Sequence, residues 1–178
     1  YNRLLRIYKN ASHMRTLISE LLDFRKQEQG YLKLKVECRD IVAFTKEVYM
    51  SFYEYALKHH IAYRFETSEP SINLWFDPVQ MQKVIINLLS NAFKYTPAEG
   101  NITVSIRMHS QQVLLQIKDS GTGIPQESIH KIFDQFYQID GQRSNLSLGT
   151  GIGLTLSKNI VELHKGNIRV ESKVDEGS

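Results

Sequence analysis

The first thirty residues carry apolar positions at the spacing of a helix. Steps of three and four residues alternate along a seam that consists of Leu4, Ile7, Ala11, Met14, Ile18, Leu21 and Arg25. This repeat is apolar except at its last position, which is typical of a helix in a bundle or coiled coil, and Gly30 is its expected stop. The stripe needs partner helices from a longer protein or from a second copy of the chain. Packing against its own domain is the alternative.

Beyond residue 30 the pattern switches between strand and helix. In chain order it predicts a strand at 32–37, a helix at 40–59, strands at 61–67 and 72–76, a helix at 77–94, a hairpin at 102–108 and 113–119, a brief helix at 128–136, a mobile loop at 137–148, a helix at 150–164 and a strand at 167–172. Asp40 and Asp77 are the expected N-caps, the second followed by Pro78 at the first helical position.

These elements divide the chain into two parts. Residues 1–30 form a long helix of the coiled-coil type, and residues 31–178 form an α/β sandwich. The sandwich is expected to have two layers, with one mixed sheet and helices over one of its faces.

Composition narrows the class of protein. The chain has 178 residues, 42% of them hydrophobic, and a net charge of +3. This mild charge with scattered Lys and Arg argues against a nucleic-acid partner. Cys38 is the only cysteine, which excludes an intrachain disulfide and a cysteine-rich metal site. No apolar run approaches the ~20 residues that span a bilayer, and no signal peptide is evident. The chain does not begin with Met, so we expect a segment of a longer protein.

Three polar side chains share one face of the helix predicted at 77–94. Asn87, Asn91 and Lys94 are separated by four and three residues. Two amide oxygens can ligate a hard cation such as Mg²⁺, and a lysine supplies a point charge for phosphate. The alternative is a solvated helix face.

Two glycine clusters follow. Asp119 precedes Gly121 and Gly123 at the end of a predicted strand, where a carboxylate can accept a hydrogen bond from an exocyclic amine. A plain turn is the alternative. The second cluster opens a helix, where free N–H groups favour phosphate, and consists of Gly149, Gly151 and Gly153. It matches neither the Walker loop nor the Rossmann fingerprint.

In this order the motifs resemble the GHKL superfamily with its Bergerat ATP-binding fold, and specifically sensor histidine kinases. NLLSNAFKYT resembles the family's asparagine box, DSGTGI resembles its first glycine box, and GTGIGL resembles its second glycine box. The stretch from Phe133 to Phe136 resembles its phenylalanine box. The resemblance covers the chain from residue 31 and implies that ATP and Mg²⁺ bind under a flexible lid.

The resemblance also implies roles for single residues. Asn91 and Asn87 would serve the metal, Lys94 would reach phosphate, Tyr95 would lie along the nucleotide and Asp119 would bind adenine. The residues implied to shape the pocket and the lid are Gly121, Gly123, Phe133, Phe136, Gly149, Thr150, Gly151, Gly153 and Leu154.

The longer protein is implied in the same way. Residues 1–30 resemble the second helix of a kinase dimerisation domain, and LLDFRKQEQGYLKLKV is similar to hybrid two-component sensors. The resemblance implies a homodimer through this helix, a response regulator or receiver domain as partner, and a cytoplasmic segment of an inner-membrane sensor protein.

The chain departs from the family pattern at several places. His13 lacks the acidic residue and the Pro of a phosphoacceptor motif, so the acceptor is expected before Tyr1. His59, His60, His109, His130 and His164 are interpreted as structural. Gln138 stands where many relatives carry Arg, which leaves Arg143 as the candidate to touch the γ-phosphate. The chain stops at Ser178, where the family adds a further strand, so that strand is expected to be truncated.

Two other functions stay open. ATPases of the superfamily, such as gyrase and the heat-shock chaperones, carry a Glu as general base one turn before the metal Asn. Asn87 stands there in this chain, and an amide cannot take a proton at neutral pH. This favours transfer to a protein nucleophile over hydrolysis. A non-catalytic dimerisation or nucleotide-binding module is the other alternative, against which the intact glycine boxes argue.

Overall fold

The computed structural model describes residues 11, 14, 15, 18, 21, 22, 25, 32–139 and 151–178. The first seven of these are helical, as the heptad spacing predicts. Met14, Ile18 and Leu21 are 61%, 55% and 43% exposed, so the described part of the chain leaves these three side chains uncovered. The expected stop at Gly30 and most of the predicted loop at 137–148 lie outside the described residues.

A three-stranded mixed sheet forms the centre of the fold. It consists of β2 (Ala62–Thr67), β4 (Asn101–His109) and β5 (Gln112–Asp119), in the order β2-β4-β5. β2 pairs parallel to β4, and β4 pairs antiparallel to β5 in the predicted hairpin. Side chains alternate across a strand, so Ile102, Val104 and Ile106 all face one side of β4, where they are fully buried.

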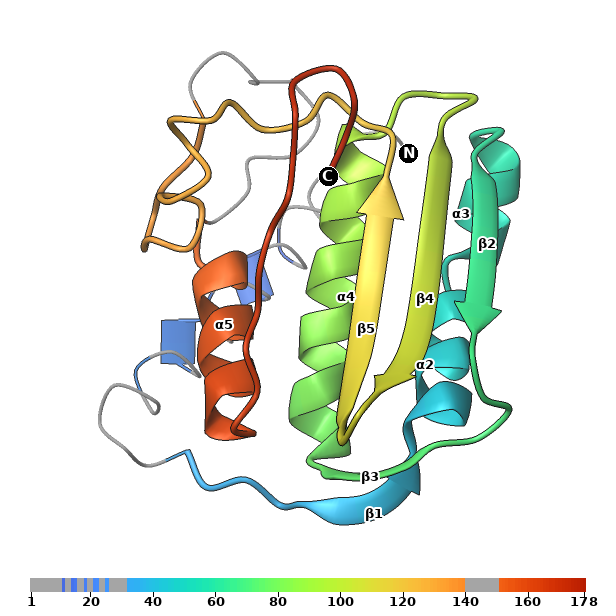
Figure 1. The fold of residues 1–178 in the computed structure, drawn as a ribbon. Helices are drawn as coiled ribbons and strands as arrows, with labels where there is room; N and C mark the ends of the chain where they lie inside the picture. The colour runs from blue at the N-terminus through green and yellow to red at the C-terminus, as the bar shows by residue number, and fades with distance from the viewer. Residues whose placement is uncertain are drawn as a thin grey trace.

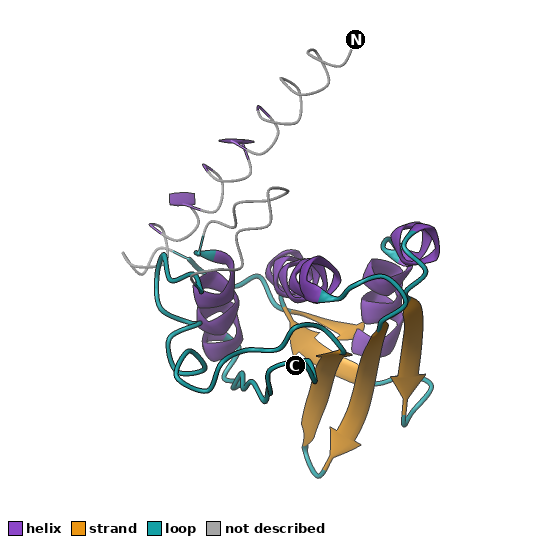
Figure 2. Cartoon of the chain, turned by 90° about the horizontal axis from the view of Figure 1, so that it is seen from above, coloured by secondary structure: helices purple, strands orange, loops and turns teal. Residues whose placement is uncertain are grey.

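The helices cover the side of the sheet to which these side chains point (Figures 1 and 2). They are α2 (Ile41–Met50), α3 (Tyr53–Lys58) and α4 (Pro78–Tyr95). On α4, Ile85 and Leu89 are four residues apart and fully buried against the sheet. Burial of each such side chain stabilises the fold by about 1.5–3 kcal/mol. The predicted two-layer sandwich with a mixed sheet is therefore confirmed.

The predicted helix at 40–59 is in fact two helices. Asp40 is the expected cap, since its Oδ1 accepts a hydrogen bond from the N–H of Val42 at 2.9 Å. The first helix ends because Ser51 donates its hydroxyl to the carbonyl of Val48 at 2.6 Å, and the N–H of Phe52 bonds Tyr49 three residues back. Such bonds tighten the last turn and compete with continuation of the α-helix.

The prediction of a single sheet was wrong. β1 (Glu37–Asp40) and β3 (Asn73–Phe76) form a separate two-stranded antiparallel sheet. β1 also begins later than predicted, because the N–H of Lys35 bonds the carboxylate of Asp77 instead of a strand.

The C-terminal part of the chain holds two further differences. The brief helix predicted at 128–136 is a series of turns, in which Lys131 and Asp134 bond carbonyls three residues back. The last helix, α5 (Gly153–Leu163), falls within the predicted range of 150–164, and in the structure it lies beside α4. Residues 167–172 form no strand, and an isolated bridge between Lys173 and Gly177 follows them.

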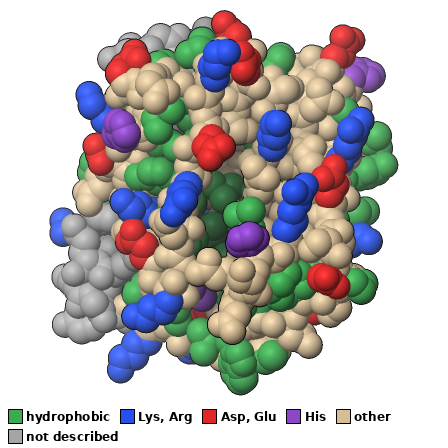
Figure 3. Space-filling view, viewed as in Figure 1, with side chains coloured by type: hydrophobic (Ala, Val, Ile, Leu, Met, Phe, Trp, Pro, Cys, Tyr) green, Lys and Arg blue, Asp and Glu red, His purple; other side chains and the backbone are tan. Residues whose placement is uncertain are grey.

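The opposite face of the sheet carries no helix in the described part of the chain (Figure 2). Figure 3 shows Lys and Arg side chains interspersed with Asp and Glu on this face, and hydrophobic side chains at the floor of a hollow. Among the helices that the structure describes, none combines the length and apolar character that a bilayer crossing requires.

Candidate functional site

The three polar residues of α4 lie where the sequence places them. Asp77 caps the helix by accepting the N–H of Gln80 at 3.1 Å, and this start sets the rotation of every later residue. Asn87, Asn91 and Lys94 are all half-buried, on a different side of the helix from the fully buried core positions. The Nζ of Lys94 lies 4.9 Å from the ring centroid of Tyr95, so ammonium and aromatic ring adjoin at the end of α4.

Asn87 joins α4 to α5. Its Nδ2 donates a hydrogen bond to Oγ of Ser157 at 2.9 Å. A Cβ at Gly153 would collide with Oδ1 of Asn87, so a larger residue there would displace the Asn87 side chain. The first residue of α5 and the Asn87 amide oxygen are therefore neighbours. Leu154, next on α5, is half-buried.

Asp119 is the last residue of β5 and begins a tightly held loop. Its Oδ1 accepts the N–H of Gly121 at 2.8 Å, and its own N–H bonds the carbonyl of Ser178 at 2.8 Å. Burial raises the pKa of Asp119 above its ordinary value, more than the hydrogen bond from Gly121 and the nearby backbone of Ser178 lower it. The carboxylate is thus a desolvated acceptor at the end of the sheet.

The loop after Asp119 contacts the end of α4. The carbonyl of Tyr95 accepts the N–H of Thr122 at 3.2 Å, and a Cβ at Gly121 would collide with the same carbonyl. Gly123 has a φ of +67°, and a Cβ there would meet the backbone of Lys173. Both predicted glycines are therefore required by close backbone approach, and they bring the carboxylate end of β5 to the ammonium end of α4.

The two phenylalanines are anchored to α5 and its preceding glycine. Thr155 donates its hydroxyl to the carbonyl of Phe133 at 2.8 Å. The N–H of Phe136 bonds the carbonyl of Gly151 at 2.9 Å, and a Cβ at Gly151 would lie 2.7 Å from the backbone of Phe136. Phe136 is 63% exposed. These contacts join the phenylalanine segment to the start of α5.

Three predicted site residues, Arg143, Gly149 and Thr150, lie outside the described residues. Two that were missed are Thr155 and Ser157, which are polar but buried on α5. A signal was present in the sequence, because both interrupt the apolar positions of a helix and a buried hydroxyl needs a partner.

No group of three or more His, Cys, Asp and Glu side chains that could hold a metal ion occurs among the described residues. The amide oxygens of Asn87 and Asn91 are the groups that the sequence marks for a cation here. Oxygen ligands of this kind suit Mg²⁺, which usually keeps water and phosphate in its remaining positions.

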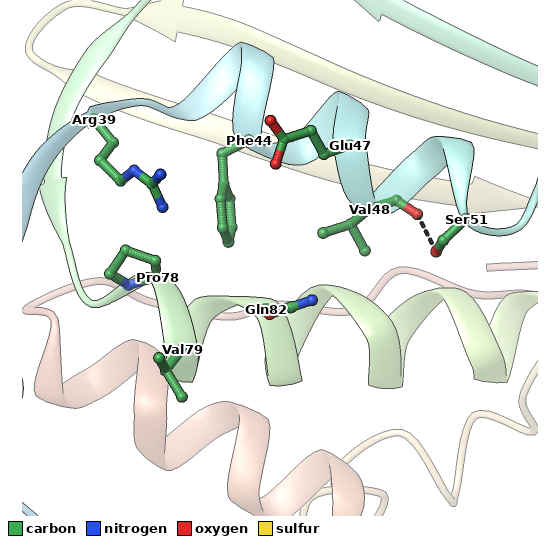
Figure 4. Close-up of a pocket in the computed structure, with 8 residues that line it drawn as sticks. All are labelled: Arg39, Phe44, Glu47, Val48, Ser51, Pro78, Val79 and Gln82. Atoms are coloured by element: carbon green, nitrogen blue, oxygen red, sulfur yellow. Dashed lines mark hydrogen bonds between the residues drawn. The ribbon is translucent and has the colours of Figure 1, made fainter.

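A cavity of about 320 Å³ lies elsewhere, between α2 and the first turn of α4. In Figure 4, Phe44 and Val48 point from α2 towards Gln82 on α4, and Arg39 and Glu47 stand at its rim. It shares no residue with the predicted nucleotide site, so the two are distinct features.

Comparison with known proteins identifies the family. Residues 76–178, more than half of the chain, match the family described as Histidine kinase-, DNA gyrase B-, and HSP90-like ATPase. The chain belongs to this family. This confirms the resemblance drawn from the asparagine and glycine boxes.

The relatives in sequence are sensor kinases. Histidine kinase P4 of Formosa agariphila is 42% identical over 181 residues, which cover 100% of this chain and 13% of that protein. Sensor histidine kinase WalK of Bacillus subtilis is 31% identical, covering 99% and 29%. The chain thus spans only a small part of these relatives.

Solved structures agree with the fold. The catalytic domain of histidine kinase ThkA is 29% identical with a TM-score of 0.65, covering 72% of this chain and 81% of that one. Histidine kinase AdeS of Acinetobacter baumannii, 23% identical, has a TM-score of 0.80 over 98% of this chain and 79% of its own, and supports the fold alone.

Proposed function

We propose that this chain is the ATP-binding catalytic region of a two-component sensor histidine kinase. It transfers the γ-phosphate of ATP to a histidine in another part of the protein, for relay to a response regulator. The observation that carries this proposal is the junction of α4 with the loop after β5. This junction brings the end of α4, which carries Asn91 and Lys94, to the loop that follows the desolvated carboxylate of Asp119.

Asp119 binds the adenine in this proposal. A carboxylate that already accepts one backbone N–H keeps lone pairs for the exocyclic amine. Gly121 and Gly123 shape the pocket by letting the loop lie close to the backbone of Tyr95 and Lys173, which keeps the Asp119 carboxylate beside the end of α4. Tyr95 supplies an aromatic surface at the adjoining end of α4, and Phe133 and Phe136 border the site.

The phosphates lie at the other side of the site, between α4 and the start of α5. Asn91 and Asn87 present amide oxygens to Mg²⁺, which supplies neutralisation of phosphate charge when bound. The Asn87 amide is oriented for this role, since its Nδ2 is held by Ser157 and its Oδ1 faces Gly153. Lys94 contributes a positive charge.

The second glycine cluster and Arg143 act on the same phosphates in this proposal. Gly151 and Gly153, with Gly149 and Thr150 before them, offer backbone N–H groups at the start of α5, and Leu154 follows them on the helix. Arg143 is the proposed contact of the γ-phosphate. Catalysis of phosphoryl transfer then rests on positioning and charge neutralisation.

Transfer is preferred to hydrolysis because of the residue at position 87. Asn87 donates from Nδ2 to Ser157 and has no group that can take a proton from water at neutral pH. The site therefore lacks a general base at this place and depends on the nucleophile that another part of the protein presents.

The exposed stripe at Met14, Ile18 and Leu21 supports a homodimer formed through the N-terminal helix, because large apolar side chains at heptad spacing favour a partner helix.

A response regulator as the partner of this chain is supported by ThkA, whose structure is described as a complex with response regulator protein TrrA. That protein is 26% identical with a TM-score of 0.75, covering 96% of this chain and 46% of its own. We place the chain in a cytoplasmic segment of an inner-membrane sensor, and its resemblance to hybrid sensors extends this proposal to a parent of the hybrid type.

Calorimetric titration of the chain with ATP tests the proposal. We expect saturable binding that requires Mg²⁺, with little steady-state hydrolysis. Absence of binding would favour a dimerisation module, and rapid hydrolysis would favour the ATPase alternative. Addition of a fragment that carries the acceptor histidine should yield acid-labile phosphohistidine.

A further inference from the structure

The imidazole of His164 joins the end of α5 to the start of α4. Its Nε2 lies 2.9 Å from the backbone nitrogen of Asp77, and its Nδ1 lies 2.7 Å from the carbonyl oxygen of Ile160. A backbone N–H only donates and a carbonyl only accepts, so Nε2 must carry the lone pair and Nδ1 the proton. One neutral tautomer satisfies both contacts.

Asp77 is a junction of three segments. It is 4% exposed, and its Oδ1 accepts the N–H of Gln80 at 3.1 Å while its Oδ2 accepts the N–H of Lys35 at 2.7 Å. The backbone N–H of an N-cap residue has no partner inside its own helix. His164 supplies that partner from α5.

The opposite end of α5 is at the candidate site. Gly153 begins the helix next to Asn87, and Ser157 accepts the hydrogen bond of Asn87. Ser157 and His164 are seven residues apart, about two turns, so they share one side of α5. Val84, Leu156 and Ile160 pack between the helices. α5 is therefore tied to α4 by a polar contact at Ser157 and by a second one at its C-cap, His164, which together restrain its rotation and its sliding.

We propose that His164 is a positioning residue of the nucleotide site. Through its Nε2 contact with Asp77 it holds α5 in the alignment that keeps Gly153 beside Asn87. This inference rests on the proposed function, since it assigns His164 to the preorganisation of the phosphate-binding end. The alternative is that the His164 side chain only fills the space between the two helix ends.

Two amide variants of His164 distinguish the positioning role from the space-filling alternative. His164→Gln places an amide oxygen near the position of Nε2, where it can still accept the Asp77 N–H. His164→Asn is too short to reach Asp77, but its Nδ2 can still donate to Ile160. Both replace the ring by a smaller amide, so each serves as the other's control.

The readout is the dissociation constant of a non-hydrolysable ATP analogue with Mg²⁺. We expect His164→Gln to bind within about two-fold of the unmutated chain. His164→Asn should bind about five- to ten-fold more weakly, the usual effect of one lost hydrogen bond that leaves a buried donor unpaired. Equal weakening in both variants, or none in His164→Asn, would overturn the proposal.

A second measurement needs no nucleotide. Nitrogen-15 NMR of the unmutated chain should show His164 at neutral pH with its proton on Nδ1, and hydrogen exchange should show a protected Asp77 amide. Protection should be lost in His164→Asn and kept in His164→Gln. A dominant Nε2–H tautomer would contradict the hydrogen bond between His164 and Asp77, and with it the proposal, even if ATP binds. Failure of ATP binding with the Nδ1–H tautomer present would refute only the proposed function.

Discussion

Asn87 donates a hydrogen bond from its side-chain amide to Oγ of Ser157 at 2.9 Å, and this contact joins α4 to α5 across the candidate site. The bond orients the amide, so that Oδ1 faces the first residue of α5. Ser157 thus directs a residue that the sequence marks for metal binding, although Ser157 itself belongs to no recognised motif.

Ser157→Ala should destabilise the chain and weaken binding of Mg²⁺ with ATP. The variant leaves the Asn87 Nδ2 without its partner, which costs about 1–2 kcal/mol at a buried position. Urea unfolding and calorimetric titration measure the two effects. Ser90→Ala, an exposed serine on α4, is the control and should change stability by less than about 0.5 kcal/mol. A neutral Ser157→Ala would contradict the orienting role.

Asn91→Ala should remove the Mg²⁺ dependence of ATP binding. Without the amide oxygen, affinity in the presence of Mg²⁺ should fall about ten-fold or more, to the value measured with chelator, equivalent to ~1.4 kcal/mol or more. Titrations with and without Mg²⁺ provide the comparison. Asn167→Ala, at an exposed position, should behave as the unmutated chain. If Asn91→Ala keeps its full response to Mg²⁺, another group holds the metal.

Asp119→Asn should reduce the preference for ATP over GTP. The variant keeps an oxygen for the Gly121 N–H but replaces an acceptor by an amide donor, so ATP affinity should fall about ten-fold through the lost charged hydrogen bond. Competition titrations measure the preference. Asp134→Asn, exposed in the turns before Phe136, is the control. Equal affinities for ATP and GTP in the unmutated chain would argue against adenine recognition by Asp119.

The same carboxylate predicts a pH dependence of binding. Burial raises the pKa of Asp119, so it gains a proton at a higher pH than an ordinary aspartate. ATP affinity should therefore fall as the pH approaches that raised pKa from above, and Asp119→Asn should not show this step.

Gly151→Ala should destabilise the junction between Phe136 and α5. Gly151 has a φ of +68°, where an L-residue is strained by about 1–2 kcal/mol, and a Cβ there would collide with the Phe136 backbone. Urea unfolding and nucleotide titration should both register the change. Gly166→Ala is the comparison, because its nearest neighbour is a side-chain methyl of Val161 and its φ lies outside the left-handed region. Equal costs in both variants would disprove the conformational argument.

Asp40 should stabilise the fold at neutral pH but not in acid. Desolvation raises its pKa, but hydrogen bonds from the N–H groups of Ile72 and Val42 and from neighbouring groups outweigh it, and the pKa is lowered from 3.8. A lowered pKa in the folded state means that the contribution is complete above 3.8 and is lost as the pH falls through the folded value. Unfolding of Asp40→Asn from pH 7 to 2 checks this. The variant's deficit should shrink in acid, and a constant deficit would contradict the linkage.

Local chemistry made the regular elements predictable. Asp40 and Asp77 start their helices as expected because an N-cap acts within a few residues of itself. The hairpin of β4 and β5 follows from alternation and a short turn. The predictions at 128–136 and 167–172 failed because short apolar stretches do not determine whether turns, helix or strand satisfy their backbone.

By itself, the sequence determined the family, the order of the elements and the candidate residues, because glycines, caps and an Asn–Asn–Lys face act at fixed spacing along the chain. Only the tertiary structure decided which residues meet. Contacts such as Asn87 with Ser157 and Asp77 with His164 join positions 70 and 87 residues apart, and no periodicity encodes the pairing of two helices. Packing of α5 against α4 places these polar atoms within hydrogen-bonding distance, and so decides how the candidate site is held.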